Sequence, residues 1–156
     1  MPEVDKYIIE AEHISFRYGE EEVLRDVSFV VAPRSYVGLV GANGSGKTTL
    51  LRVLLGLSFP SAGKIKLFGV PVGAFCDWRK IGYVPQNVFR VDVNFPATAE
   101  EVVASGQFSG SYVVIQKAMS RAGILHLRKK RIGELSGGER QRVFIARALI
   151  SDPELI

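Results

Sequence analysis

The stretch Gly41-Ala42-Asn43-Gly44-Ser45-Gly46-Lys47-Thr48 decides the fold of this chain. Its glycines let the backbone curl so that successive N–H groups point inward at phosphate oxygens, a conformation that side chains would obstruct. The lysine supplies a positive charge for the outer phosphates, and the threonine hydroxyl can bind Mg²⁺. This order of residue types therefore predicts a loop that binds a nucleoside triphosphate together with its metal ion.

The sequence on either side of the loop supports this interpretation. Tyr36–Val40 is a continuous apolar run, which predicts a strand buried on both faces in a parallel sheet. Thr48–Leu57 carries apolar residues at positions 50, 51, 54 and 55, a spacing that predicts a helix. The alternative, a flexible glycine-rich turn, requires neither element, so the strand and the helix together favour phosphate binding.

The rest of the pattern predicts an α/β fold. Further strands are expected at residues 7–18, 27–31, 63–68 and 81–84, and the start of another at 154–156. Helices are expected at residues 98–105, 113–122 and 138–150, the first opened by a capping box of Thr98 and Glu101. A strand-rich first half is thus followed by a helical insert that begins near residue 88.

Composition and charge limit the class of protein. With 156 residues, 47% apolar and 23% charged, the chain suits one soluble globular domain. The apolar stretch 50–57 is too short for a bilayer, the N-terminus has no signal-peptide pattern, and Cys76 fits a reducing compartment, so a cytoplasmic protein is expected. The net charge is +4, but the basic run 128–131 lacks stacking aromatics, which favours a solvated face over a nucleic-acid site.

A second constellation, Leu135-Ser136-Gly137-Gly138-Glu139, precedes the last expected helix. Ser136 and Glu139 have the spacing of a capping box, which is a purely structural explanation. The same residues also offer a hydroxyl and two unobstructed glycine N–H groups at a helix N-terminus, which is an anion site. Two phosphate sites in one chain suggest that one of them serves a second nucleotide.

Four segments in this order resemble one family. Gly41–Thr48 resembles the Walker A loop, and Leu135–Arg142 resembles the ABC signature motif, commonly written L-S-G-G-Q. Tyr83-Val84-Pro85-Gln86 is similar to the Q-loop, and Phe16-Arg17-Tyr18-Gly19 to the aromatic A-loop. The chain thus resembles the nucleotide-binding domain of ABC-type ATPases over nearly its whole length. Glu139 departs from the family glutamine and leaves the serine and glycines of the signature intact.

The resemblance implies a fold and a set of roles. The fold is a P-loop NTPase core with an N-terminal antiparallel β portion, divided into a catalytic part (1–87), a helical part (88–134) and the signature segment with its helix (135–156). Tyr18 would stack on adenine, while Lys47 and Gln86 would be catalytic, and Thr48 and Gln86 would hold Mg²⁺. The implied ATP-binding residues are Tyr18, Gly41, Asn43, Gly44, Ser45, Gly46, Lys47, Thr48, Thr49, Ser136, Gly137, Gly138 and Glu139.

The resemblance also implies partners. Ser136, Gly137 and Gly138 would contact the γ-phosphate held by a second subunit in a head-to-tail dimer that ATP closes and hydrolysis opens. Permease subunits in the membrane would convert this cycle into transport, with the ATPase on the cytoplasmic face. In the family, a segment like 148–156 continues into Walker B, with an aspartate for Mg²⁺ and a catalytic glutamate. Without these, we expect the 156-residue chain alone to be inactive, less stable and prone to self-association.

The substrate and two alternative functions stay open at this point. Asn94–Val103 resembles the corresponding segment of ATPases from zinc- and manganese-type metal importers. A soluble ABC ATPase that acts on nucleic acid or ribosomes is one alternative, and a non-hydrolysing nucleotide-binding module is the other. The helical insert is short and has no sustained heptads, which favours the transporter. His13 and His126 have no partners at metal-ligand spacing, and each is expected to be a structural or surface histidine.

Overall fold

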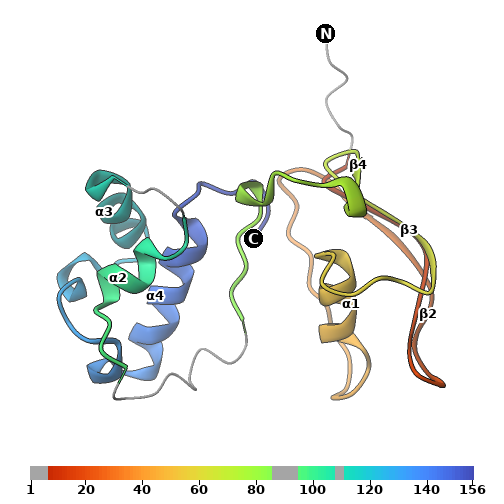
Figure 1. The fold of residues 1–156 in the computed structure, drawn as a ribbon, viewed down its shortest axis with the longest axis horizontal. Helices are drawn as coiled ribbons and strands as arrows, with labels where there is room; N and C mark the ends of the chain where they lie inside the picture. The colour runs from red at the N-terminus through yellow and green to blue at the C-terminus, as the bar shows by residue number, and fades with distance from the viewer. Residues whose placement is uncertain (1–6, 86–94, 108–110) are drawn as a thin grey trace, which may run out of the picture. The chain divides into compact units, whose positions relative to one another are not determined.

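The computed structural model describes residues 7–85, 95–107 and 111–156. They fall into two compact units, Met1–Cys76 and Asp77–Ile156. The first unit contains the strands and one helix, and the second contains the other α-helices (Figure 1). In the described ranges, no helix combines the length and the apolar character that a membrane span requires.

The first unit is built on an antiparallel sheet with the strand order β2-β1-β3-β4. The strands are β1 (Ile9–Tyr18), β2 (Glu21–Val31), β3 (Ala62–Leu67) and β4 (Val70–Pro71). Apolar side chains of β1 and β3 alternate with polar ones and are buried, as a sheet with one wet face requires. The helix α1 (Lys47–Leu54) lies beside this sheet, contacts β2 and buries Leu50, Val53 and Leu54 (Figure 1). A 3₁₀ turn at Val72–Ala74 follows β4.

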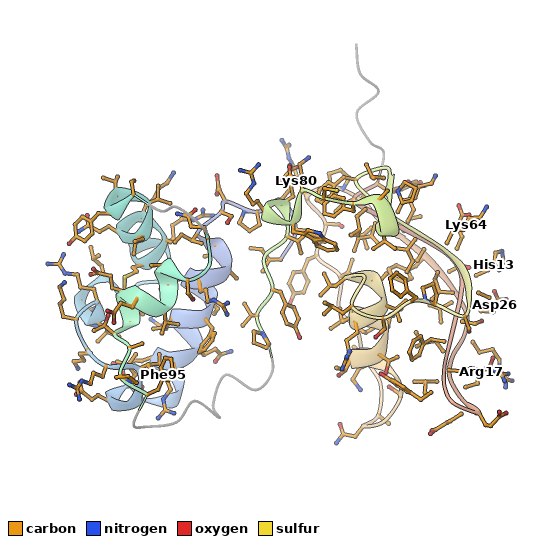
Figure 2. The ribbon with its side chains drawn as sticks, viewed as in Figure 1. His13, Arg17, Asp26, Lys64, Lys80 and Phe95 are labelled. Carbon is orange, nitrogen blue, oxygen red and sulfur yellow. The ribbon has the colours of Figure 1, made fainter. Side chains whose placement is uncertain are left out.

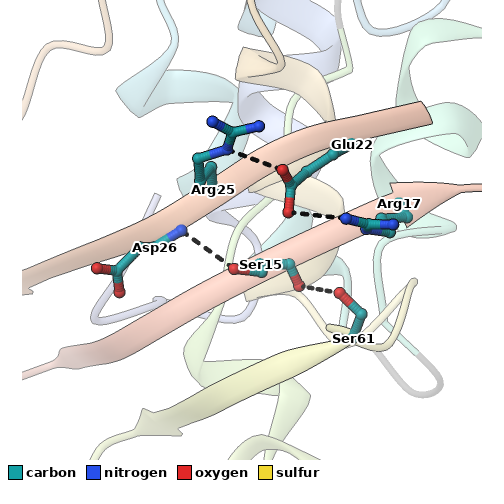
Figure 3. A network of polar contacts seen from close by, with 6 residues as sticks. All are labelled: Ser15, Arg17, Glu22, Arg25, Asp26 and Ser61. Atoms are coloured by element: carbon teal, nitrogen blue, oxygen red, sulfur yellow. Dashed lines mark hydrogen bonds and ion pairs between the residues drawn. The ribbon is translucent and has the colours of Figure 1, made fainter. Parts of the chain in front are cut away.

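The exposed face of this sheet is held by polar contacts across β1 and β2. Glu22 accepts a hydrogen bond from Arg25 at 2.8 Å and lies 3.5 Å from Arg17 (Figure 3). The bond from Arg25 is the main reason that the pKa of Glu22 lies below its usual value. His13 and Asp26 both have left-handed backbone and pair with each other on this face (Figure 2). His13 therefore has a structural contact here.

The described residues of the second unit form three α-helices that pack around one core. These are α2 (Ala99–Ala104), α3 (Tyr112–Arg121) and α4 (Gly137–Leu149), joined by 3₁₀ turns at Leu125–Leu127 and Ile132–Glu134, with another at Trp78–Lys80. Each helix contributes apolar residues at helical spacing to the core. The core residues are Ala99, Val103, Ile115, Ala118, Met119, Ile124, Leu127, Ile132, Leu135, Val143, Ala146 and Ile150.

The start of α2 is fixed by the predicted capping box. The carboxylate of Glu101 accepts the N–H and the hydroxyl of Thr98, both at 2.7 Å. The hydroxyl oxygen of Thr98 in turn accepts the N–H of Glu101 at 3.3 Å. The backbone bond from Thr98, followed by its hydroxyl, lowers the pKa of Glu101. The carboxylate is therefore ionised while it holds the first turn of the helix.

Of the predicted strands, the one at residues 36–40 does not form and the one at residues 81–84 is reduced to a single bridge. Tyr36–Val40 forms no strand, and the Tyr36 side chain is 99% exposed, so the prediction of a buried parallel strand is wrong for this structure. An apolar run forms a parallel strand only beside neighbouring strands, and within the described ranges nothing pairs with it. The predicted strand at 81–84 is reduced to one parallel bridge between Ile81 and Leu155, and the predicted strand start at 154–156 is likewise limited to Leu155.

We predict that the second core is sensitive to cavities and its surface is not. Met119→Ala removes a fully buried side chain of α3 and should lower the free energy of unfolding by about 2–5 kcal/mol. Val113→Ala on the same helix changes a side chain that is 70% exposed and should cost less than about 0.5 kcal/mol. Urea unfolding of both variants measures the difference, and equal shifts would contradict the assigned core.

The lowered pKa of Glu101 gives a pH-dependent prediction. A carboxylate with a depressed native pKa stabilises the fold above its unfolded pKa, and this stabilisation disappears as the pH falls through the native pKa. Glu101→Gln keeps the shape of the capping box but loses the charge. The variant should therefore unfold at lower urea than wild type at pH 7, and the gap should close toward pH 3. A gap that stays constant with pH would contradict the ionised capping box.

Candidate nucleotide-binding site

The glycine-rich loop and the start of α1 form the first part of the site. Gly44 and Gly46 both have a φ of 84°, a left-handed backbone conformation that residues with a side chain rarely adopt. Gly46 is the N-cap of α1, and its carbonyl accepts the N–H of Leu50 at 2.8 Å. The loop therefore ends at a helix N-terminus, where free N–H groups and the helix dipole favour an anion. The prediction of a helix directly after the loop is confirmed.

Lys47 folds back over the loop that precedes it. Its ammonium donates to the carbonyl of Gly41 at 2.7 Å and to the carbonyl of Ala42 at 2.6 Å. It also lies 3.4 Å from the hydroxyl oxygen of Ser45. The lysine ammonium is a positively charged donor, and its present partners are neutral oxygens. An anion would bind this ammonium more strongly and could therefore replace them.

Close packing explains glycine at position 46 better than glycine at position 41. A β-carbon at Gly41 would lie 2.6 Å from the Ser45 hydroxyl oxygen, which can move by rotation of its side chain. At Gly46 it would lie 3.0 Å from Leu24 and 3.1 Å from the carbonyl oxygen of Val23, both in β2. The loop is therefore seated directly on β2, and its narrow backbone curl depends on the missing side chains.

The same hairpin carries Tyr18 at its turn. Tyr18 is the last residue of β1 and pairs with Glu21, two positions before Val23. Its ring is half exposed and meets Phe16 edge to face, with ring centroids 4.8 Å apart. Phe16 is buried and pairs with Leu24, the residue that Gly46 packs on. A short chain of contacts thus links the exposed aromatic face to the loop.

The other predicted residues of this loop differ in exposure. Asn43, Ser45 and Thr48 are exposed, whereas Thr49 is buried at the first turn of α1. Thr48 is exposed next to Lys47, and its hydroxyl is an oxygen ligand of the kind that Mg²⁺ prefers. The glycine cradle, the helix N-terminus and these donors fit a nucleotide triphosphate with Mg²⁺.

The second predicted anion site lies in the other unit, at the start of α4. Ser136 is the N-cap, and its hydroxyl oxygen accepts the N–H of Glu139 at 3.3 Å. The Glu139 carboxylate accepts the N–H of Ser136 at 2.8 Å and its hydroxyl at 2.7 Å. A β-carbon at Gly138 would meet nothing within 4 Å, so the helix start is open on that side. The structure thus confirms the capping box, and it leaves the glycines accessible.

The charge of Glu139 is stabilised by its neighbours. The hydrogen bond from the Ser136 hydroxyl lowers the pKa of Glu139 most, followed by the Ser136 N–H. The charges of Lys130 and His126 lower this pKa further. The residue that replaces the family glutamine therefore brings a full negative charge to the start of the helix.

Sequence reasoning missed several contacts around these motifs. The guanidinium Nε of Arg140 donates to the carbonyl of Leu135 at 2.9 Å and holds the segment before Ser136.

A groove of about 660 Å³ runs where Trp78 and Tyr83 approach the end of α4. Close approaches at Gly82 and Gly106 form it, because β-carbons there would lie within 2.7 Å and 2.5 Å of α4 carbonyl oxygens. The sequence signal was the glycines themselves.

The remaining predicted site residue, Gln86, lies outside the residues that the structure describes. Its predicted catalytic and Mg²⁺-binding role stays a prediction. The described part of the Q-loop segment ends at Pro85, with Tyr83 half exposed beside the groove.

Comparisons with known proteins agree with the motifs. The zinc uptake system ATP-binding protein ZurA of Listeria monocytogenes is 44% identical, over 97% of this chain and 63% of its own length. The zinc import ATP-binding protein ZnuC of Cereibacter sphaeroides is 40% identical, over 96% of this chain and 57% of its own length. The chain therefore spans less than two thirds of the length of these relatives.

A solved structure and a family model give the same answer. The structure of cbiO1 from Clostridium perfringens, part of the ABC transporter complex cbiONQ, has a TM-score of 0.80 and 27% identity, over 95% of this chain and 63% of that one. It confirms the α/β P-loop NTPase fold class. The family model described as ABC transporter matches residues 24–156. The chain therefore belongs to the ABC transporter family, as one of its ATP-binding domains.

Proposed function

We propose that this chain is the ATP-binding part of a subunit that energises an ABC-type metal-ion importer. The observation that carries the proposal is the geometry of the loop 41–47. Gly44 and Gly46 have left-handed backbone, the loop ends at the N-terminus of α1, and the ammonium of Lys47 binds the carbonyl of Gly41. On this proposal, an arriving triphosphate replaces the carbonyls of Gly41 and Ala42 as partners of that ammonium. The exchange is favourable because phosphate oxygens are charged acceptors and carbonyls are neutral.

The other residues of the site would each bind a different part of the nucleotide. Tyr18 would stack its exposed ring on adenine, and Asn43, Ser45 and the loop N–H groups would bind phosphate oxygens. Thr48 would hold Mg²⁺, with Gln86 as a further ligand, and the ion would neutralise charge on the phosphates. Thr49 would support the loop from its buried position. The assignments in the loop rest on residue type, exposure and position, whereas the assignment of Gln86 rests on the sequence resemblance.

We further propose that the protein works in a complex. Ser136, Gly137 and Gly138 would bind the γ-phosphate held by a second copy, in a head-to-tail dimer on the cytoplasmic face of the membrane. Permease subunits would couple its opening and closing to transport. The similarity to ATP-binding proteins of zinc uptake and zinc import supports a metal-ion substrate, as does the resemblance of the segment 94–103.

Hydrolysis would require groups beyond those assigned so far. Phosphoryl transfer depends on the charge of the metal ion and on an oriented attacking group, here a water. Neither of the residues assigned to the metal ion, Thr48 and Gln86, is a carboxylate that could activate the attacking water. A non-hydrolysing nucleotide-binding module is therefore the second candidate function for the 156-residue polypeptide by itself.

Lys47 should determine ATP affinity. Lys47→Ala removes the ammonium that binds the loop carbonyls and should weaken ATP-Mg binding at least about tenfold, or about 1.4 kcal/mol. Lys64→Ala on β3 removes an exposed lysine of the same unit and is the matched control, with affinity unchanged. Titration calorimetry measures both variants. Equal affinities for Lys47→Ala and wild type would rule out the proposed phosphate site.

Turnover separates the two candidate functions. The 156-residue polypeptide should bind ATP-Mg yet release phosphate at well under about 1 per second, the low end of typical enzyme rates. Steady-state phosphate release at saturating ATP-Mg measures this, with Lys47→Ala as the background. Release at several per second that depends on Lys47 would show that the chain supplies its own catalytic carboxylate.

A further inference from the structure

The hydroxyl of Ser136 has only one proton, and its hydrogen-bond acceptor is the carboxylate of Glu139. The hydroxyl donates to the Glu139 carboxylate at 2.7 Å, and its oxygen accepts the N–H of Glu139 at 3.3 Å. A serine hydroxyl has one donor and two acceptor lone pairs. Its single donor is therefore committed to a negatively charged group inside its own chain.

This arrangement conflicts with the role proposed for Ser136. A phosphate oxygen accepts hydrogen bonds and cannot donate to a hydroxyl oxygen unless it is protonated. To bind the γ-phosphate of a second subunit, Ser136 must turn its proton away from Glu139. The Glu139 carboxylate would then lose a charge-assisted hydrogen bond and face a second anion.

We infer that Glu139 is a latch on the signature segment: it holds the Ser136 proton within its own chain and thereby weakens ATP-dependent association of two subunits. This inference rests on the proposed function, which brings Ser136 to the nucleotide of a partner. Glu139 is a positioning residue in this scheme because it acts through Ser136. A glutamine at position 139 would keep the capping geometry with a weaker, uncharged acceptor.

The surroundings of Glu139 favour the ionised latch. Lys130 and His126 are the charged or titratable groups whose charge acts on it, and Arg140 is occupied by the carbonyl of Leu135. Glu139 itself is half-buried, whereas Ser136 and Gly138 are exposed. The latch thus lies behind an open helix start that a partner could reach.

The capping box of α2 provides a matched control. Thr98 and Glu101 repeat the same three hydrogen bonds at 2.7, 2.7 and 3.3 Å. No nucleotide is proposed to bind there. A role in helix capping alone would make Glu101→Gln and Glu139→Gln equivalent, whereas a latch makes them different.

Sedimentation of the 156-residue chain with saturating ATP-Mg tests the latch. Glu139→Gln should strengthen ATP-dependent association about tenfold, whereas Glu101→Gln should leave it at the wild-type value. In a Ser136→Ala background, Glu139→Gln should lose at least half of its effect, because the latch acts through that hydroxyl. Thermal unfolding of each variant checks that the fold is intact.

Three outcomes would overturn the latch. They are unchanged or weaker association of Glu139→Gln, an equal gain for Glu101→Gln, and no association of any variant while calorimetry shows ATP bound. Failure of the proposed ATP site is recognised separately, because wild type would then give no heat with ATP-Mg. A gain for Glu139→Gln alone, reduced by Ser136→Ala, would support the latch.

Discussion

The candidate site depends on a left-handed turn before α1, which glycine adopts with the least strain. The left-handed backbone at Gly44 and Gly46 turns the chain into α1, and the absent β-carbon at Gly46 lets the turn rest on Val23 and Leu24. The ammonium of Lys47 then closes the curl by binding its carbonyls. Because the turn rests on β2, the hairpin that carries Tyr18 and the phosphate loop form one local structure.

Local patterns in the sequence predicted most of the elements correctly. The helix after the loop, the capping boxes at Thr98 and Ser136, and the strands of the antiparallel sheet follow from spacing and turn residues within a few positions. These features form from contacts close in sequence, which is why short windows reveal them. The predicted strand in β2 began at residue 27, whereas the structure extends it to Glu21, because pairing with β1 continues to the hairpin turn.

Features that depend on distant partners could not be predicted in this way. Tyr36–Val40 has the composition of a buried strand, yet burial requires neighbouring strands, and it is exposed here. The groove near Trp78 arises where glycines at 82 and 106 let the chain approach α4, and no window of sequence contains all three parts. The competition for the Ser136 proton became visible only with the distances to Glu139, since the capping spacing alone suits both a structural and a binding role.

In the proposed site, backbone amides of the loop bind the terminal phosphates of ATP. An NMR titration of the chain labelled with the heavy nitrogen isotope tests this binding most directly. With ATP-Mg, the amide protons of Gly44, Gly46 and Lys47 should move far downfield because they become donors to charged oxygens, whereas AMP should leave them nearly unchanged. The amide of Gly123 in the other unit is the internal reference. Equal shifts with AMP and ATP, or loop amides that do not move, would contradict phosphate binding by this loop.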